Sequence, residues 1–282
     1  MSVRALTSPG FLSVLSSGAV PPKRTVIFAA TPWELKAVQA AFPPGVERCH
    51  SGISVSVHWV GAGEYWLAQT GMGLEKARRS ANQLLVEQPI DLVVSTGFAC
   101  ALIEANIGAL LVGLEVVQKT AQGSKSVLTS SMVVSGNERN FALTVIKTMV
   151  PPERIGRFVS TDRVVGSAKE KREFAKSTEA IGLDMESAAL AAEASRAQVP
   201  FIVIRSVSDL LDEDLPLDFN LFLSPTGWLK GVTAVLTTPS SLLGLGRLRR
   251  QSAVAAQTLT DFFRQYVASM TIETQPQELS LM

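Results

Sequence analysis

The feature that most constrains the fold of this chain is PIDLVVSTGFACAL at residues 89–102, a continuous apolar run that leads into a glycine turn. A run of this kind is typical of a parallel strand that is buried on both faces. RTVIFAA at 24–30 and PFIVIRSVSD at 200–209 have the same apolar character. Parallel strands need long crossover connections, so helices are expected between these segments.

Segments with helical spacing do lie between the apolar runs. TPWELKAVQAAF at 31–42 offers Thr31 as N-cap and Pro32 at the first helical position, and GLEKARRSANQLLVEQ at 73–88 and MESAALAAEASRA at 185–197 are further helices. Strands that alternate with helices predict an α/β fold, a three-layer α/β/α arrangement around a central mixed, mainly parallel sheet. Ligands of such sheets bind outside the C-terminal ends of the strands.

Composition narrows the class of partner and site. The chain has 282 residues, and its 26 Lys and Arg nearly balance 25 Asp and Glu, so no strong field attracts nucleic acid or membrane. Cys49 and Cys100 lie far apart and indicate neither a disulfide framework nor a zinc site, which fits a reduced cytoplasm. The only histidines, His50 and His58, lack metal-ligand spacing, so neither a metal nor a cofactor is predicted. A small-molecule partner is expected.

Three acids stand at predicted strand-to-helix junctions, and each has two interpretations. Asp209 is either an N-cap or, at the dry edge of a pocket, a proton donor. Glu186 is either a first-turn acid favoured by the helix dipole or a clamp for a vicinal diol such as ribose. Glu34 forms a capping box with Thr31 or belongs to the same site. The residues alone leave these alternatives open.

Longer motifs carry a resemblance to a known family. LDMESAALAAEASRAQVPFIVIRSVSD at 183–209 resembles the signature of the nucleoside phosphorylase and nucleosidase superfamily, which includes methylthioadenosine/S-adenosylhomocysteine nucleosidases and purine and uridine phosphorylases. VIFAATPWELKAV at 26–38, TGMGLEKARRSAN at 70–82 and DLVVSTGFACAL at 91–102 resemble three further family segments in the same order. The resemblance covers roughly residues 24 to 222.

This resemblance implies roles for the sugar-binding and catalytic residues. Met185 is expected to pack under the ribose, and Glu186 to bind its hydroxyl groups. Asp209 is expected to donate a proton to N7 of a purine, and Glu34 to orient or deprotonate an attacking water. Cleavage of a ribosyl C–N bond passes through an oxocarbenium-like state, which explains the need for an acid on one side and carboxylates near the sugar.

The same resemblance implies a base site and reveals departures. Val164 and Val165 occupy the position where backbone and apolar atoms hold the base, and Ser208 precedes the acid as a further substrate contact. Phe98 stands where the nucleosidases have a small hydroxyl residue, and Cys100 replaces a glycine. The Gly-Asp-Pro and arginine that hexameric phosphorylases use for phosphate are missing. Hydrolysis of an adenine nucleoside is therefore predicted; the alternatives are phosphorolysis and nucleoside binding without turnover.

The domain limits follow from these segments. Residues 1–23 are expected to form a flexible extension, 24–222 the nucleoside phosphorylase-like domain, 223–271 a C-terminal helical appendage and 272–282 a disordered tail. The appendage loosely resembles a bacterial branch associated with hopanoid synthesis, whose enzyme removes adenine from adenosylhopane. Its apolar runs are too broken to span a bilayer, so only weak membrane association is expected. Family members are commonly dimers or larger, which implies a homodimer.

Overall fold

The computed structural model describes residues 23–122, 125–131, 134–216, 220 and 239–272, so the predictions for the two chain ends fall almost wholly outside it. The strands are β1 (Arg24–Ala29), β2 (Val46–His50), β3 (Ile53–Val60), β4 (Gly63–Gln69), β5 (Leu92–Ala101), β6 (Leu110–Gln122), β7 (Lys125–Ser131), β8 (Ile155–Thr161), β9 (Gly182–Asp184) and β10 (Phe201–Asp209). The helices are α2 (Pro32–Gln39), α3 (Leu74–Glu87), α4 (Asn137–Lys147), the short 3-10 helix η2 (Pro152–Arg154), α5 (Ala168–Thr178), α6 (Ser187–Arg196) and α8 (Pro239–Ile272).

The strands form one ten-stranded mixed sheet. The strands β4, β1, β5 and β10 lie side by side and run parallel, as the apolar runs predict for β1, β5 and β10. The sheet also closes on itself, because β5 pairs with β10 and β9, while β10 continues through β6 and β8 back to β9. The short strand β9 and the polar edge strand β2 were not predicted, since neither shows apolar alternation.

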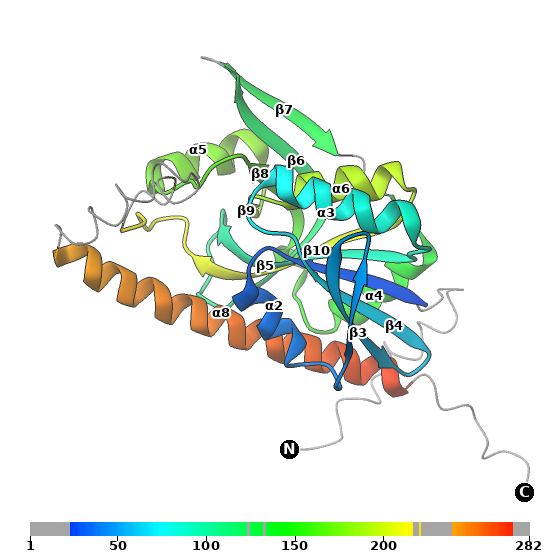
Figure 1. Cartoon of the computed structure of the whole chain (residues 1–282). Helices are drawn as coiled ribbons and strands as arrows, with labels where there is room; N and C mark the ends of the chain where they lie inside the picture. The colour runs from blue at the N-terminus through cyan, green and yellow to red at the C-terminus, as the bar shows by residue number, and fades with distance from the viewer. Residues whose placement is uncertain (1–22, 123–124, 132–133, 217–219, 221–238, 273–282) are drawn as a thin grey trace, which may run out of the picture.

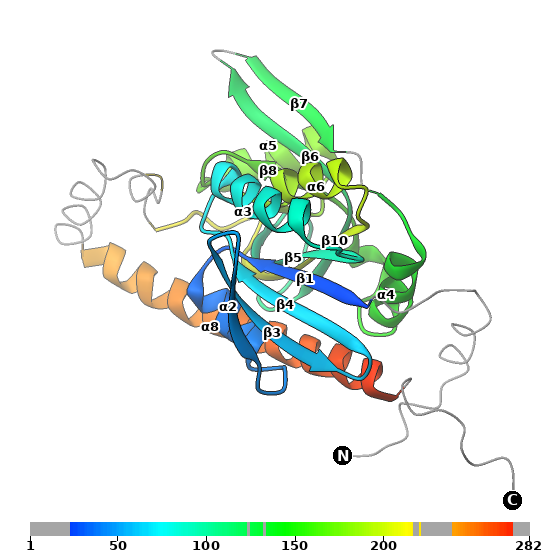
Figure 2. The ribbon, with the colours of Figure 1, turned by 45° about the vertical axis from the view of Figure 1, so that its right-hand side comes forward.

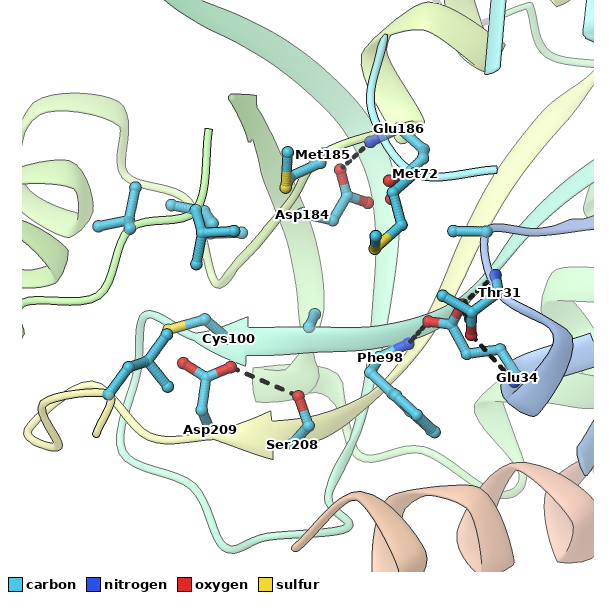
Figure 3. Close-up of a pocket in the computed structure, with 16 residues that line it drawn as sticks. Thr31, Glu34, Met72, Phe98, Cys100, Asp184, Met185, Glu186, Ser208 and Asp209 are labelled. Carbon is cyan, nitrogen blue, oxygen red and sulfur yellow. Dashed lines mark hydrogen bonds between the residues drawn. The ribbon is translucent and has the colours of Figure 1, made fainter. Parts of the chain in front are cut away.

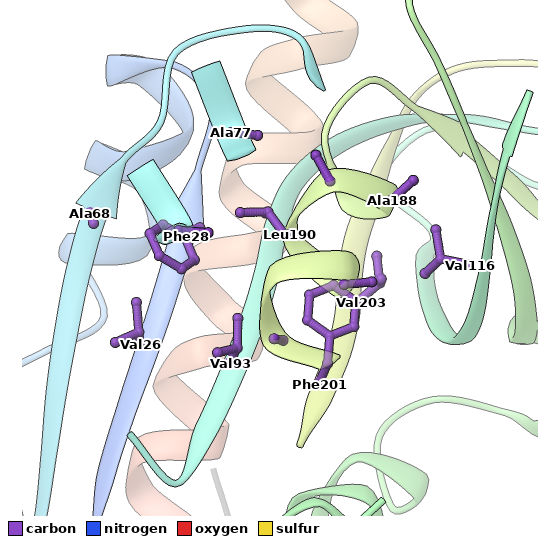
Figure 4. Packing of buried hydrophobic residues seen from close by; sticks show 14 of the residues in the cluster. Val26, Phe28, Ala68, Ala77, Val93, Val116, Ala188, Leu190, Phe201 and Val203 are labelled. Carbon is purple, nitrogen blue, oxygen red and sulfur yellow. The ribbon is translucent and has the colours of Figure 1, made fainter. Parts of the chain in front are cut away.

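Helices cover both faces of the sheet, which confirms the three-layer arrangement (Figure 1). Successive residues of β1 enter different cores: Val26 and Phe28 pack beneath α3 and α6, and Ile27 packs on the opposite face. Figure 4 shows Phe28 and Val93 close to Leu190 of α6. Each of these three positions of β1 therefore buries its side chain, which is worth about 1.5–3 kcal/mol for a large aliphatic or aromatic group.

The opposite face is covered by α2, α4 and α8. Figure 2 shows α8 as one long helix that runs past α2 and along the sheet. Leu259, Phe262 and Phe263 of α8 lie in the second core, the hydrophobic cluster on the face of the sheet that also contains Ile27. The Thr260 hydroxyl donates to the carbonyl of Ala37 at 2.7 Å. The described part of α8 thus packs into the body of the domain. Among the described helices none is both long enough and apolar enough to cross a membrane.

Candidate active site

A cavity of about 240 Å³ opens beside the C-terminal ends of β1, β5 and β10. This is the edge of an α/β sheet where ligands are expected. Every residue that the sequence assigned to the site lines this one cavity: Glu34, Phe98, Val164, Val165, Met185, Glu186, Ser208 and Asp209. The structure brings these residues together, and their individual roles stay predictions.

The polar side chains lie at separate ends of the cavity (Figure 3). Asp209 lies at one end beside Ser208 and Cys100, and Glu34 lies at the other end. Glu186 lies along a third side. A ligand inside would therefore meet one carboxyl group at each end and another between them.

Asp209 is the last residue of β10, where the strand is irregular. The pairing with β5 shifts register between Val207 and Asp209, so Ser208 is an extra residue that interrupts the alternation. A bulge of this kind re-aims the following side chain, and here Val207 enters the core while Asp209 faces the cavity. No helix begins within residues 210–216, and the carboxylate bonds instead to Lys171 Nζ at 2.7 Å and the Ser208 hydroxyl at 3.4 Å. The structure therefore does not support the N-cap interpretation of Asp209.

Glu186 is buried at the N-cap position of α6, yet its side chain does not cap that helix. Its Oε1 accepts the backbone N–H of Gly73 at 2.8 Å, across the cavity wall in the turn before α3. Burial raises the pKa of Glu186 to about 7, the charge of Arg205 opposes this, and Asp184 adds to it. Near neutral pH the group therefore changes between a carboxylate and a neutral acid.

Glu34 forms the capping box that the sequence offers, and it also lines the cavity. Its Oε2 accepts the N–H and the hydroxyl of Thr31, each at 2.8 Å, which completes a capping box at the start of α2. Its Oε1 accepts the backbone N–H of Phe98 at 2.7 Å and lies at the cavity wall. Only glycine fits at Gly97 (φ +137°), because a Cβ there would collide with Glu34 Oε1 and lie 2.6 Å from Arg205 Nη1.

Arg205 and Asp184 form a buried ion pair next to Glu186, and neither residue was predicted from the sequence. Arg205 Nε donates to Asp184 Oδ2 at 3.1 Å, and its Nη2 lies 3.7 Å from Glu186 Oε2. Burial disfavours the charged guanidinium, but Asp184 and Glu186 outweigh this and raise the pKa of Arg205. An arginine inside the apolar strand FIVIRSVSD was the available signal, since a buried arginine requires anionic partners.

The predicted base end of the cavity is apolar. Val165 is buried and Val164 partly buried. The N–H of Val164 donates to Asn220 Oδ1 at 2.7 Å, and its carbonyl accepts from Asn220 Nδ2 at 2.9 Å. Because this N–H already has a partner, a base held here contacts the valine side chains unless Asn220 moves.

The charged side chains that line the cavity are acidic, and the cations Lys171 and Arg205 contact three of them from behind the lining. Its lining includes the carboxyl groups of Glu34, Asp184, Glu186 and Asp209, and none of the described lining residues is a lysine or arginine. No group of His, Cys, Asp and Glu in the described part of the chain is placed to hold a metal ion. The arrangement suits acid–base work on a neutral ligand that develops positive charge.

The fold and this acid-lined cavity define an α/β protein built to act on a small polar ligand. The chain belongs to the phosphorylase superfamily, whose family model matches residues 24–224. A methylthioadenosine/S-adenosylhomocysteine nucleosidase of Staphylococcus aureus is 28% identical over 170 residues, which cover 57% of this chain and 75% of that protein.

Solved structures of two Helicobacter pylori proteins share the fold. The methylthioadenosine/S-adenosylhomocysteine nucleosidase matches with a TM-score of 0.64 at 18% identity, covering 90% of this chain and 100% of that one. Futalosine hydrolase matches with a TM-score of 0.64 at 18% identity, covering 89% and 98%. At this identity the likeness is one of fold.

Proposed function

We propose that this protein hydrolyses the N-glycosidic bond of an adenine nucleoside. The observation that carries the proposal is the placement of Asp209 and Glu34 at opposite ends of one cavity, with Glu186 between them. Asp209 gives a proton to N7 of the base, and the C1′–N9 bond breaks with its electron pair going to the base. Water then attacks C1′ and passes its proton to Glu34.

Glu186 and Met185 hold the sugar in this proposal. A carboxylate accepts the two hydroxyl groups of a ribose, and Glu186 projects into the cavity beside Met185. The positive charge that develops on the ribosyl group is stabilised by the surrounding carboxylates. The likeness to proteins named as nucleosidase and hydrolase supports the same reaction class.

Water suits this cavity better than phosphate does. A phosphate dianion needs cationic or N–H donors, and carboxylates at the anomeric carbon repel it. The described lining supplies four carboxyl groups and no lysine or arginine. The N–H of Phe98, a donor near the expected position of the nucleophile, is already bonded to Glu34.

Binding without turnover was another alternative, because Phe98 could crowd the sugar. The ring of Phe98 packs edge-on against Trp33 of α2, with centroids 6.0 Å apart. Figure 3 shows it pointing away from Met185 and Glu186. In this orientation the ring does not crowd a sugar held by Met185 and Glu186, which favours an enzyme.

A substrate panel tests the proposal. Adenosine, methylthioadenosine, adenosylhomocysteine and a lipid-linked adenosine are each incubated with purified protein, with and without phosphate. We expect adenine release from at least one nucleoside, with little change on adding phosphate. Tight binding without adenine release would indicate a binding protein, and strict phosphate dependence would indicate a phosphorylase.

We also propose a homodimer located in the cytoplasm. Trp33 and Met72, which are 45% and 47% exposed, are large apolar side chains, and Met72 lines the cavity. A second copy covering them would close the pocket. Cys49 and Cys100 are free thiols, which suits a reducing compartment. Light scattering at two protein concentrations tests the assembly.

A further inference from the structure

Lys171 is a fully buried lysine on the inner face of α5. Its side chain is 0% exposed, and it shares its helix face with Ala168, Phe174 and Thr178, which are also buried. Removing an ammonium group from water is costly unless the group is fully paired. A lysine at this position therefore needs strong hydrogen-bond and charge partners, whereas an apolar residue could be buried there without any.

The ammonium group of Lys171 has an acceptor for each of its three protons. Nζ donates to Asp209 Oδ1 at 2.7 Å, to the carbonyl of Leu210 at 3.0 Å and to the carbonyl of Glu213 at 2.8 Å. An ammonium group has three donors and no acceptor, so Lys171 is saturated. Contacts in three directions fix its position and that of Asp209.

The two oxygens of Asp209 consequently differ. Oδ1 is held by Lys171, which leaves Oδ2 as the oxygen available to a ligand. Oδ2 accepts a long hydrogen bond of 3.4 Å from the Ser208 hydroxyl. The other titratable neighbour is the Cys100 thiol, whose pKa burial and the charge of Asp209 raise well above its usual value, so it stays neutral.

We propose that Lys171 is the positioning residue of the proton donor Asp209, an inference that rests on the proposed glycosidic cleavage. Its ammonium group holds Oδ1, so that Oδ2 carries the transferable proton and is directed at the base. It also stabilises the carboxylate that remains once the proton has moved to the base. No bond to Lys171 forms or breaks, and its charge acts as a fixed, preorganised partner.

The loop that follows Asp209 strengthens this arrangement. Asp214 Oδ1 accepts the backbone N–H of Ala168 at 2.7 Å, so the loop also binds the N-terminus of α5. Gln251 of α8 donates to Glu213 Oε2 at 3.0 Å. The lysine is therefore one of several contacts that hold this loop, and its own contribution to Asp209 can be tested separately.

The test compares two leaving groups in the full chain. Adenine must be protonated when its bond to the ribose breaks. The para-nitrophenolate of a para-nitrophenyl riboside departs as a stable anion and needs no proton. We expect Lys171→Met to lower kcat for the adenine nucleoside by roughly 10²-fold, the lower end of what a general acid contributes. Its kcat for para-nitrophenyl riboside and its KM for the nucleoside should change less than threefold, taking ~3-fold as the margin of a neutral change.

Matched variants separate positioning from folding. Lys171→Arg keeps the charge and should recover most of the adenine-releasing activity, while Lys169→Met, at an exposed position on the same helix, should behave as wild type. If Lys171→Met does not fold, Lys171→Gln, which keeps a hydrogen-bond donor without charge, should show the same selective loss. Equal loss for both substrates, or full adenine release in either uncharged variant, would overturn the proposal. An inactive wild type would instead refute the proposed function.

Discussion

At the residue scale, the proposed mechanism gives different tasks to carboxyl groups that have different hydrogen-bond partners. Glu34 accepts three hydrogen bonds from Thr31 and Phe98, which hold it as an acceptor. Asp209 has one oxygen on Lys171 and one facing the cavity. Carboxyl groups placed in such unlike surroundings are the usual basis for separate acid and base roles in one enzyme.

The role of Asp209 leads to a direct prediction. Asp209→Asn keeps the shape and hydrogen-bonding capacity of the side chain but removes the proton that the base needs. We expect adenine release to fall by about 10²–10⁴-fold while nucleoside affinity, measured by calorimetry, changes little. Activity that survives with only a lower melting temperature would show that Asp209 is structural.

Glu186 predicts a pH dependence of substrate binding. Its pKa of about 7 means that the carboxylate, the better acceptor for two ribose hydroxyls, forms as the pH rises through that value. The KM of a ribonucleoside should therefore fall as pH rises across neutrality, and Glu186→Gln should raise KM and flatten the profile. A dideoxy nucleoside serves as the control, since it lacks the hydroxyls and should be insensitive to the substitution. Equal effects on both nucleosides would place Glu186 elsewhere in the mechanism.

The sequence predicted the residues that line the cavity better than the buried cations Lys171 and Arg205 that pair with them. Asp209, Glu186 and Glu34 lie in long motifs at strand ends, where the chain pattern itself points to a site. Lys171 and Arg205 are different, because each is a charged residue inside an otherwise regular helix or strand. The apolar strand around Arg205 signals a buried charge, but the polar helix around Lys171 does not, and the distant carboxylates that pair with each become known only from the structure.

At the scale of elements, β10 shows what periodicity can and cannot predict. Its alternation between two cores follows from the apolar run, with Phe201 and Val203 on one face and Ile202 and Ile204 on the other. The bulge at its end does not follow from that pattern, since it depends on register with β5. Pairing between distant strands therefore decides which way Asp209 points.

The helix α8 provides a prediction about stability. Phe263 is 1% exposed within the second core, whereas Val254 on the same helix is 49% exposed. Phe263→Ala should lower the free energy of unfolding by about 3–5 kcal/mol, and Val254→Ala by less than about 0.5 kcal/mol. Urea denaturation measures both. Similar small losses would mean that α8 is a detachable appendage; a single cooperative transition with a large loss at Phe263 would make it part of the domain.

At the scale of the whole molecule, the closed part of the sheet brings the residues of the cavity together. The cavity wall includes the ends of β5, β9 and β10, and the helices α2 and α6 begin beside it. A nearly neutral chain of this kind has no strong overall field, so the proposed preference between ligands rests on the carboxyl groups that line the cavity. The proposal therefore expects neutral nucleosides and water to be favoured over phosphate.

The source of the oxygen in the sugar product tests the central claim most directly. The protein is incubated with methylthioadenosine in phosphate-free, oxygen-18-labelled water, and the sugar is analysed by mass spectrometry under conditions that limit exchange at the anomeric carbon. Hydrolysis predicts free adenine and a sugar that has gained one labelled oxygen at C1′, at a rate that added phosphate leaves nearly unchanged. Adenine release that requires phosphate and yields an unlabelled sugar 1-phosphate would contradict the account.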